Sequence, residues 1–216
     1  IGVEKKKNWI SGAALYQFPN KFKLTSGWGN DNLFNNGEKL SFDLSGAIAL
    51  LSYPLRTGDK WIYGILKYKM PYVLFNFLSF NSQAGANYEF YEFYRKQDFL
   101  IKGGISKSIN YFSVFNNYSY KLSIVDTNVE NLTYRYERVT TNSTDLTFYF
   151  DNRDNVLSPT NGLYSTVLLE YAGGIFKGYN NFYKYTVEAA FFKTFFNAVT
   201  TGLRFKTGTI FPFGVS

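Results

Sequence analysis

The sequence predicts an all-β protein, and more specifically an antiparallel transmembrane β-barrel. Two observations support this prediction. Apolar residues alternate with polar ones along many separate segments, which is the pattern of a strand with one apolar face. In addition, 21% of the residues are Phe, Tyr or Trp, although charged residues make up 18% and the mean hydropathy is only −0.20. Membrane barrels combine aromatic girdles with alternating strands. A soluble β-sandwich, the alternative class, rarely exposes so many rings.

The composition also limits the chemistry. The 216 residues include no Cys and no His, which excludes disulfides, thiolate metal sites and Ser-His hydrolase chemistry within this chain. A Gly-x-Ser-x-Gly nucleophile elbow is absent too. We therefore expect no enzyme activity, no catalytic residue, no cofactor and no metal site. The net charge is +7 and only Lys5–Lys7 forms a basic run, so we expect membrane lipids as partners and no nucleic acid.

The two ends of the chain suggest how it is organised. No stretch of roughly 18 apolar residues is present, as a spanning helix would require. The first residues are too polar for a secretory signal peptide, so we expect a mature protein or an excerpt. Residues 1–8 are predicted to end an upstream segment, because Ile1 and Val3 alternate before the lysines; a disordered tail is the alternative. Residues 9–216 are predicted to form the barrel domain.

The first barrel strand is predicted at residues 9–18. Its residues are Trp9, Ile10, Ser11, Gly12, Ala13, Ala14, Leu15, Tyr16, Gln17 and Phe18. The small and polar residues at its centre weaken side-chain packing and strand pairing. Pro19 and Asn20 then turn the chain.

The next two strands alternate clearly. Residues Lys21–Trp28 form the second, and residues Asn30–Glu38 form a turn that ends in Asn-Gly. Residues Lys39–Leu50 form the third and most regular strand. One of its faces carries Leu40, Phe42, Leu44, Gly46, Ile48 and Leu50, and the other carries Lys39, Ser41, Asp43, Ser45, Ala47 and Ala49.

The other strands follow from the same alternation and from turn residues. They are predicted at Trp61–Met70 (ended by Pro71), Phe75–Tyr94 (ended by the charged residues 95–98), Phe99–Lys107, Asn110–Val125, Asp145–Phe150, Leu163–Tyr171, Asn181–Phe195 and Ala198–Phe211. Residues 126–143 are polar and are predicted to include an extension beyond the membrane. The total is about eleven strands, most near the roughly 9–11 residues that a tilted membrane strand requires.

The most distinctive segment is residues 151–174, DNRDNVLSPTNGLYSTVLLEYAGG. Its first half concentrates residues that cap, fix or reverse a turn. Pro159 cannot donate a ladder hydrogen bond, so it must lie at the start of a strand or outside it. Gly162 permits a backbone conformation that other residues avoid, just before the strand that starts at Leu163.

This segment resembles the motif of the bacterial surface antigen barrel family, the barrel of BamA, TamA and their organellar relatives. The residues that match are Asp151, Arg153, Asp154, Asn155, Pro159, Thr160 and Gly162. Residues 32–37 are similar to the family's asparagine-leucine-phenylalanine-glycine turn, with Asn35 where the family usually has Gly. A generic β-turn of another β protein is the alternative reading of the motif.

The resemblance implies an incomplete barrel. The eleven strands would be the first eleven of sixteen, and residues 1–8 would end a periplasmic POTRA-like segment. The sequence stops where the family's long inward-folded loop would begin, and the Val/Ile-Arg-Gly-Phe/Tyr tetrapeptide of that loop is absent. An open sheet in lipid would leave unpaired strand edges, which is not tolerable as a final state.

The resemblance also implies a function: assembly and insertion of outer-membrane proteins. Residues 9–18 would be the lateral-gate strand, whose edge pairs with a strand of an unfolded client. Glu188 and Arg204 are predicted to line the lumen, where they and the motif residues Asp151 and Arg153 would face the inward loop. Periplasmic or lipoprotein accessory subunits are expected partners, and the membrane is expected to be the bacterial outer membrane or its organellar equivalent. A polypeptide-secretion barrel, a porin and the barrel anchor of an upstream hydrolase remain as alternatives.

Overall fold

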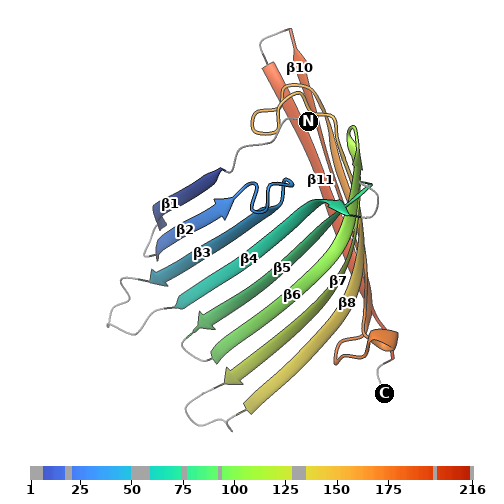
Figure 1. Cartoon of the computed structure of the whole chain (residues 1–216). Helices are drawn as coiled ribbons and strands as arrows, with labels where there is room; N and C mark the ends of the chain where they lie inside the picture. The colour runs from blue at the N-terminus through green and yellow to red at the C-terminus, as the bar shows by residue number, and fades with distance from the viewer. Residues whose placement is uncertain are drawn as a thin grey trace. The chain divides into compact units, whose positions relative to one another are not determined.

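The computed structural model describes residues 7–17, 21–49, 59–73, 77–91, 94–127, 135–196 and 199–214. Eleven strands form one sheet in chain order, from β1 to β11 (Figure 1). Their bounds are β1 Asn8–Gln17, β2 Lys21–Asn30, β3 Lys39–Ala49, β4 Lys60–Val73, β5 Leu78–Phe90, β6 Tyr94–Ile109, β7 Phe112–Thr127, β8 Arg135–Asp151, β9 Gly162–Ala172, β10 Phe182–Phe195 and β11 Val199–Pro212. A 3₁₀ turn, η1, covers Gly174–Phe176. Within the described ranges, no helix is long and apolar enough to cross a membrane.

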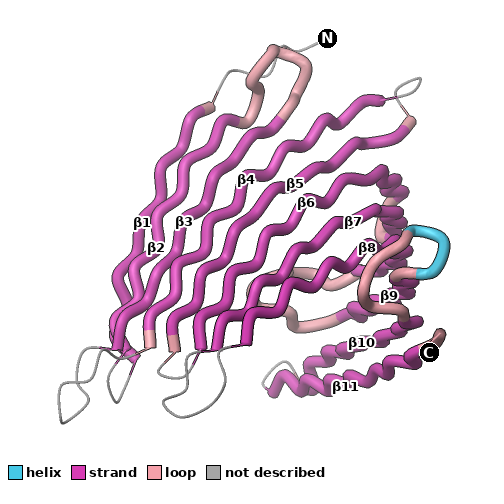
Figure 2. Tube along the Cα trace, turned by 90° about the horizontal axis from the view of Figure 1, so that it is seen from below, coloured by secondary structure: helices cyan, strands magenta, loops and turns pink. Residues whose placement is uncertain are grey.

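The chain divides into two compact units. The first contains residues 1–103 and 119–141, and the second contains residues 104–118 and 142–216. In the first unit β1 to β5 lie side by side, each antiparallel to the next (Figure 2). In the second unit β9 pairs with the end of β8 and with β10, and β10 pairs with β11 over its whole length.

The strands place large apolar side chains outward. On β3, Phe42, Leu44 and Ile48 are 41%, 40% and 48% exposed. On the opposite face, Asp43 accepts a hydrogen bond of 2.9 Å from Lys67 of β4. The only buried hydrophobic residues of the described chain are Ala47, Ile65, Ala172 and Ala190, whereas its buried polar residues include Asp98, Asn117, Ser143 and Asp145. A protein folded in water shows the reverse preference, so the exposed rings and aliphatic side chains require an apolar solvent.

Several predicted strand boundaries are wrong, among them the end of β5, which is Phe90 and not Tyr94. Pro71 does not end β4, which continues to Val73; the register with β5 shifts between Met70 and Val73, and a proline is tolerated at such an irregularity. The charged residues 95–98 do not interrupt a strand, because β6 begins at Tyr94 and runs through them. Lys96 and Asp98 of this run form an ion pair of 2.9 Å, so their charges compensate each other within the sheet.

Another wrong boundary lies at the start of β8. This strand begins at Arg135, ten positions before the predicted Asp145, so much of the polar segment 126–143 is strand. Its polar side chains pair across the sheet: Ser143 donates a hydrogen bond of 2.9 Å to Glu170 of β9. The predicted loop at residues 51–60 lies mostly outside the described residues, and Lys60 belongs to β4.

Aromatic rings gather at one end of the strands in the second unit. Tyr171 of β9 stacks on Phe213 with ring centroids 5.5 Å apart and planes inclined by 7°. Tyr183 of β10 lies 4.7 Å from the same ring, and Phe176 of η1 lies 5.8 Å from Tyr171. Such a cluster at the strand ends is typical of the aromatic belt at a membrane–water interface.

Candidate functional site

The first strand is paired along its whole length with β2. The register runs from Asn8 opposite Asn30 to Gln17 opposite Lys21. Among the described strands β2 is the only partner of β1, which stands at the end of the strand order. The side chains of Ile10 and Tyr16 are 84% and 60% exposed. The predicted gate strand is therefore a strand with one unpaired edge within the described chain, while its last predicted residue, Phe18, lies outside the described residues.

At its beginning, β1 makes close side-chain contacts with β2. The indole ring of Trp9 lies against two glycines of β2: a Cβ added at Gly29 would come within 2.4 Å of the ring, and one at Gly27 within 3.2 Å. Asn8 accepts a hydrogen bond of 2.6 Å from Asn30. Residues 10 to 16 are all exposed, and the small residues Gly12, Ala13 and Ala14 lie at the centre of the strand. The packing of Trp9 on two glycines therefore holds the beginning of β1 against β2.

The β2–β3 turn is an ordered network that the sequence indicated only by its asparagines. Asn35 adopts φ 69°, which explains why glycine is also suited to this position. Asn32 is fully buried and accepts a hydrogen bond of 2.8 Å from the amide of Gly37. Burial raises the pKa of Glu38, but hydrogen bonds from its own amide and from Asn36 outweigh burial, and the pKa lies below its ordinary value. Neither Asn32 nor Glu38 was predicted as a site residue.

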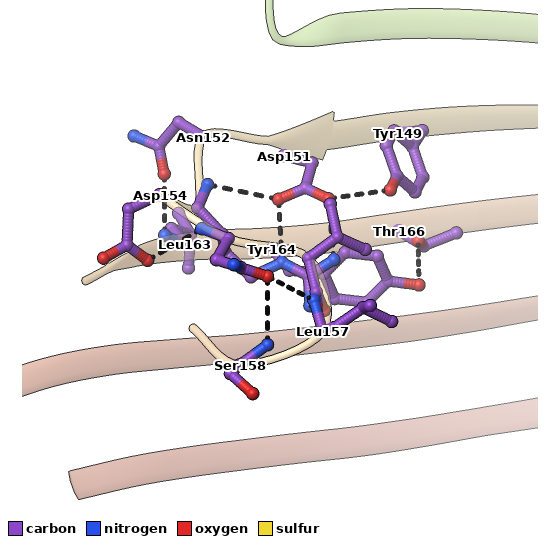
Figure 3. Close-up of polar contacts among 12 residues, drawn as sticks. Tyr149, Asp151, Asn152, Asp154, Leu157, Ser158, Leu163, Tyr164 and Thr166 are labelled. Atoms are coloured by element: carbon purple, nitrogen blue, oxygen red, sulfur yellow. Dashed lines mark hydrogen bonds and ion pairs between the residues drawn. The ribbon is translucent and has the colours of Figure 1, made fainter. Parts of the chain in front are cut away.

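The β8–β9 turn, residues 152–161, is organised around the Asp154 carboxylate. This group accepts hydrogen bonds from the amides of Asn155 (2.9 Å), Thr160 (2.9 Å) and Asn161 (3.2 Å), and from the hydroxyl of Thr160. Asn155 in turn accepts bonds from two later amides of the turn, those of Leu157 and Ser158 (Figure 3). The motif residues Asp154, Asn155 and Thr160 therefore form one local network, as side-chain capping of a turn requires. Pro159 lies within this irregular segment and outside any strand, as predicted.

The hydrogen bonds to Asp154 predict that the stability of the folded protein depends on pH. Hydrogen bonds from Thr160 and then from the neighbouring amides lower the pKa of Asp154 from 3.8 to about 2. Because the folded-state pKa is depressed, the stabilising effect is complete above about pH 4 and is lost as the pH falls towards 2. We expect Asp154→Asn to remove this component of acid sensitivity. The measurement is the folded fraction between pH 2 and pH 5; equal acid sensitivity in both proteins would contradict the network.

The end of β8 carries the most enclosed ion pair of the turn. Arg153 donates to both carboxylate oxygens of Asp151, over 2.8 Å from Nε and 2.7 Å from Nη2. Tyr149 donates to the same carboxylate over 2.9 Å, and the guanidinium lies 4.9 Å from the ring centroid of Tyr164 on β9. Figure 3 shows Tyr149 and Asp151 side by side on the strand. The carboxylate raises the pKa of Arg153, so the guanidinium stays charged.

Gly162 closes the turn where β9 begins. Its φ is 119°, and an added Cβ would lie 2.6 Å from the Cα of Arg153 and 2.8 Å from the carbonyl oxygen of Asn152. Asn152 fixes the same point from the other side, because its side chain accepts a hydrogen bond of 2.6 Å from the amide of Leu163. Only glycine fits here, for both steric and conformational reasons.

Comparison with known proteins decides the family. The Omp85 superfamily domain matches residues 32–216. The chain belongs to the Omp85 superfamily. Among curated proteins, no sequence matches this chain.

Solved structures support the fold of this Omp85 chain. The crystal structure of BamA from Haemophilus ducreyi lacking POTRA domains 1–3 matches with a TM-score of 0.76 at 14% sequence identity, and the match covers 98% of this chain. The present chain spans only 42% of the length of the BamA chain. The predicted fold class is therefore confirmed: the eleven strands are part of an antiparallel transmembrane barrel, and the family membership assigns it to an outer membrane.

The charged residues of this Omp85 chain that were predicted to face the lumen do not form one cluster. Glu188 of β10 accepts a hydrogen bond of 2.9 Å from Nε of Arg204 on β11 and lies 3.2 Å from Nζ of Lys206. Asp151 is instead bound by Arg153. Among the described residues, no hydrogen bond or ion pair joins these two pairs. Each pair satisfies its own charge, and the predicted contact with an inward loop is left as a prediction. No group of three potential metal ligands occurs among the described residues.

Proposed function

We propose that this chain supplies the wall and the first-strand edge of an outer-membrane protein assembly factor, where an unfolded client pairs with β1. The observation that carries the proposal is β1 itself: it is the first strand of the sheet, ten of its residues pair with β2, and Gly12, Ala13 and Ala14 lie at its centre. Unpaired backbone groups cannot be left in lipid. An incoming strand would satisfy them by β-augmentation, the process in which an extended segment adds to a sheet edge.

The composition of β1 supports reversible use of this edge. Gly12 has no side chain, and the methyl groups of Ala13 and Ala14 offer little area for packing, so a client strand bound there can be released. Trp9 holds the beginning of β1 on Gly27 and Gly29, which keeps the strand in the sheet during exchange. The proposed activity involves no covalent chemistry, so the chain is not an enzyme in this account.

The proposed partners follow from the same edge. They are unfolded outer-membrane clients and membrane lipids, together with periplasmic or lipoprotein accessory subunits that deliver clients. The proposed membrane is the bacterial outer membrane. A barrel that secretes polypeptides or works as a porin would not pair with its cargo through β1, and the test below separates these alternatives.

The test is site-specific cross-linking during client assembly. Ser26 of β2 lies directly opposite Gly12 of β1 and has strands on both sides, so it provides a matched control. In the full-length protein we expect Gly12→Cys to form disulfide adducts with a client that carries a cysteine in its terminal strand, and Ser26→Cys to form at least about tenfold fewer. Equal yields at both positions, or no client adduct at Gly12 while clients still assemble, would exclude β1 as the templating edge.

A further inference from the structure

The outer face of the first unit contains an apolar groove. It has a volume of about 560 Å³ and is lined by side chains of four consecutive strands, among them Leu24 of β2, Leu44 and Ile48 of β3, and Ile62 of β4. These four side chains are 54%, 40%, 48% and 57% exposed, so they belong to the outward, membrane-facing surface. The volume lies within the range of about 300–1,000 Å³ that is typical of sites for small ligands.

Gly46 lies in the floor of the groove. Gly46 stands between Leu24 on β2 and Ile62 on β4 in the strand register, on the face that carries the apolar side chains. The absence of a side chain there leaves a depression between larger neighbours. An added Cβ would meet nothing closer than 3.4 Å, so the glycine is not required by the backbone. A larger residue at this position would therefore fill the hollow from the outer surface.

A cation and aromatic rings mark one end of the groove. Lys60, the first residue of β4, lies in the lining and pairs in register with Ile48 and with Phe90, the last residue of β5. Tyr88 and Phe90 complete this end. Among the residues that the structure describes, no carboxylate forms an ion pair with Lys60. Lysine and aromatic rings at strand ends are typical of the headgroup level of a bilayer.

The groove then descends from that level. From Ile48 to Leu44 the four-residue distance along β3 is about 13 Å, and the side chains on this path are aliphatic. A site with a cation at one end and an apolar floor is complementary to an anionic lipid. The phosphate would lie at the cation and the hydrocarbon chain would lie on the apolar floor. A client strand would fit it less well, because the backbone groups of β3 and β4 beneath the groove are already paired with each other.

We propose that this groove binds an anionic phospholipid, with one acyl chain over Gly46 and the phosphate at Lys60. The bound lipid covers the outer face of β2 to β5 and fixes the position of this face in the bilayer. The site is separate from the β1 edge, so it does not depend on the templating function proposed above.

The experiment uses the full-length protein in nanodiscs with a photoreactive phosphatidylglycerol that carries a diazirine in its acyl chain. We expect the lipid to cross-link to residues of β3 and β4. Lys60→Gln should reduce this label about fivefold, the loss of one lysine–headgroup attraction, and Gly46→Leu should reduce it by filling the groove. A control variant on the outward surface of β10 in the second unit, Lys193→Gln, should leave it unchanged.

The outcomes are decisive in either direction. Equal labelling by a photoreactive phosphatidylcholine, or unchanged labelling in Lys60→Gln, would mean that lipid at this face is only part of the general annulus and would overturn the proposal. If Gly46→Leu does not fold, the comparison of Lys60→Gln with Lys193→Gln still gives the answer, because both are exposed surface substitutions.

Discussion

Replacement of Gly162 by valine is expected to destabilise the folded barrel by about 3 kcal/mol, through left-handed backbone strain and overpacking. The backbone at this position has φ 119°, and a Cβ would lie 2.6 Å from the Cα of Arg153. A backbone atom cannot move aside without displacing the turn between β8 and β9. The measurement is the midpoint of denaturant unfolding of the protein in detergent, followed by the heat-dependent mobility that distinguishes a folded barrel from an unfolded chain.

The control for this prediction is another glycine of the sheet. At Gly64 of β4 the nearest atom to an added Cβ is 3.7 Å away, which is ordinary van der Waals contact. Gly64→Ala should therefore leave the unfolding midpoint almost unchanged. If Gly162→Val were as stable as Gly64→Ala, the described conformation of the β8–β9 turn would be wrong.

Loss of the Asp151 carboxylate is expected to have the second largest effect. Asp151→Asn removes the charged partner of a guanidinium that is 13% exposed and that also lies over Tyr164. Hydrogen bonds to charged groups contribute about 1.5–3 kcal/mol each in proteins, so we expect a destabilisation of about 2 kcal/mol. The measurement is the same unfolding midpoint, at neutral pH.

A matched control separates this effect from a general loss of charge. Asp43 of β3 pairs with Lys67 of β4, but these two side chains are 37% and 50% exposed. Exposed pairs contribute little, so Asp43→Asn should cost less than about 1 kcal/mol. Similar losses in both variants would show that the Asp151–Arg153 pair is no more important than an ordinary exposed ion pair.

The sequence predicted the strand number, the alternation and the central turn because each depends on neighbouring residues. Leu44 and Asp43 are adjacent, so their opposite orientation follows from strand geometry alone. Asp154, Asn155 and Thr160 lie within seven positions of one another, and their capping chemistry is local. Local signals wrongly predicted a break in the strand at residues 95–98. The charges there are compensated by the ion pair between Lys96 and Asp98 and by Lys121 of β7, and this compensation depends on the folded sheet.

The remaining features depend on register, which one sequence does not reveal. The contact of Trp9 with Gly27 and Gly29 requires that residues 9 and 29 stand opposite each other. The groove over Gly46 likewise requires its alignment with Leu24 and Ile62. Glu188 and Arg204 were both predicted to line the lumen, but their contact with each other follows from the alignment of β10 with β11.

The most direct test of the account is an accessibility scan along β3. Spin-labelled cysteines placed singly at positions 40–48 of the full-length protein in lipid vesicles report collisions with oxygen, which concentrates in the bilayer, and with a water-soluble nickel chelate. The account predicts a period of two, with high oxygen accessibility at the positions of Leu40, Phe42, Leu44 and Ile48 and high chelate accessibility at those of Ser41, Asp43 and Ser45. Uniform accessibility, or the opposite phase, would contradict a membrane-facing apolar surface and with it the assignment of this sheet as a barrel wall.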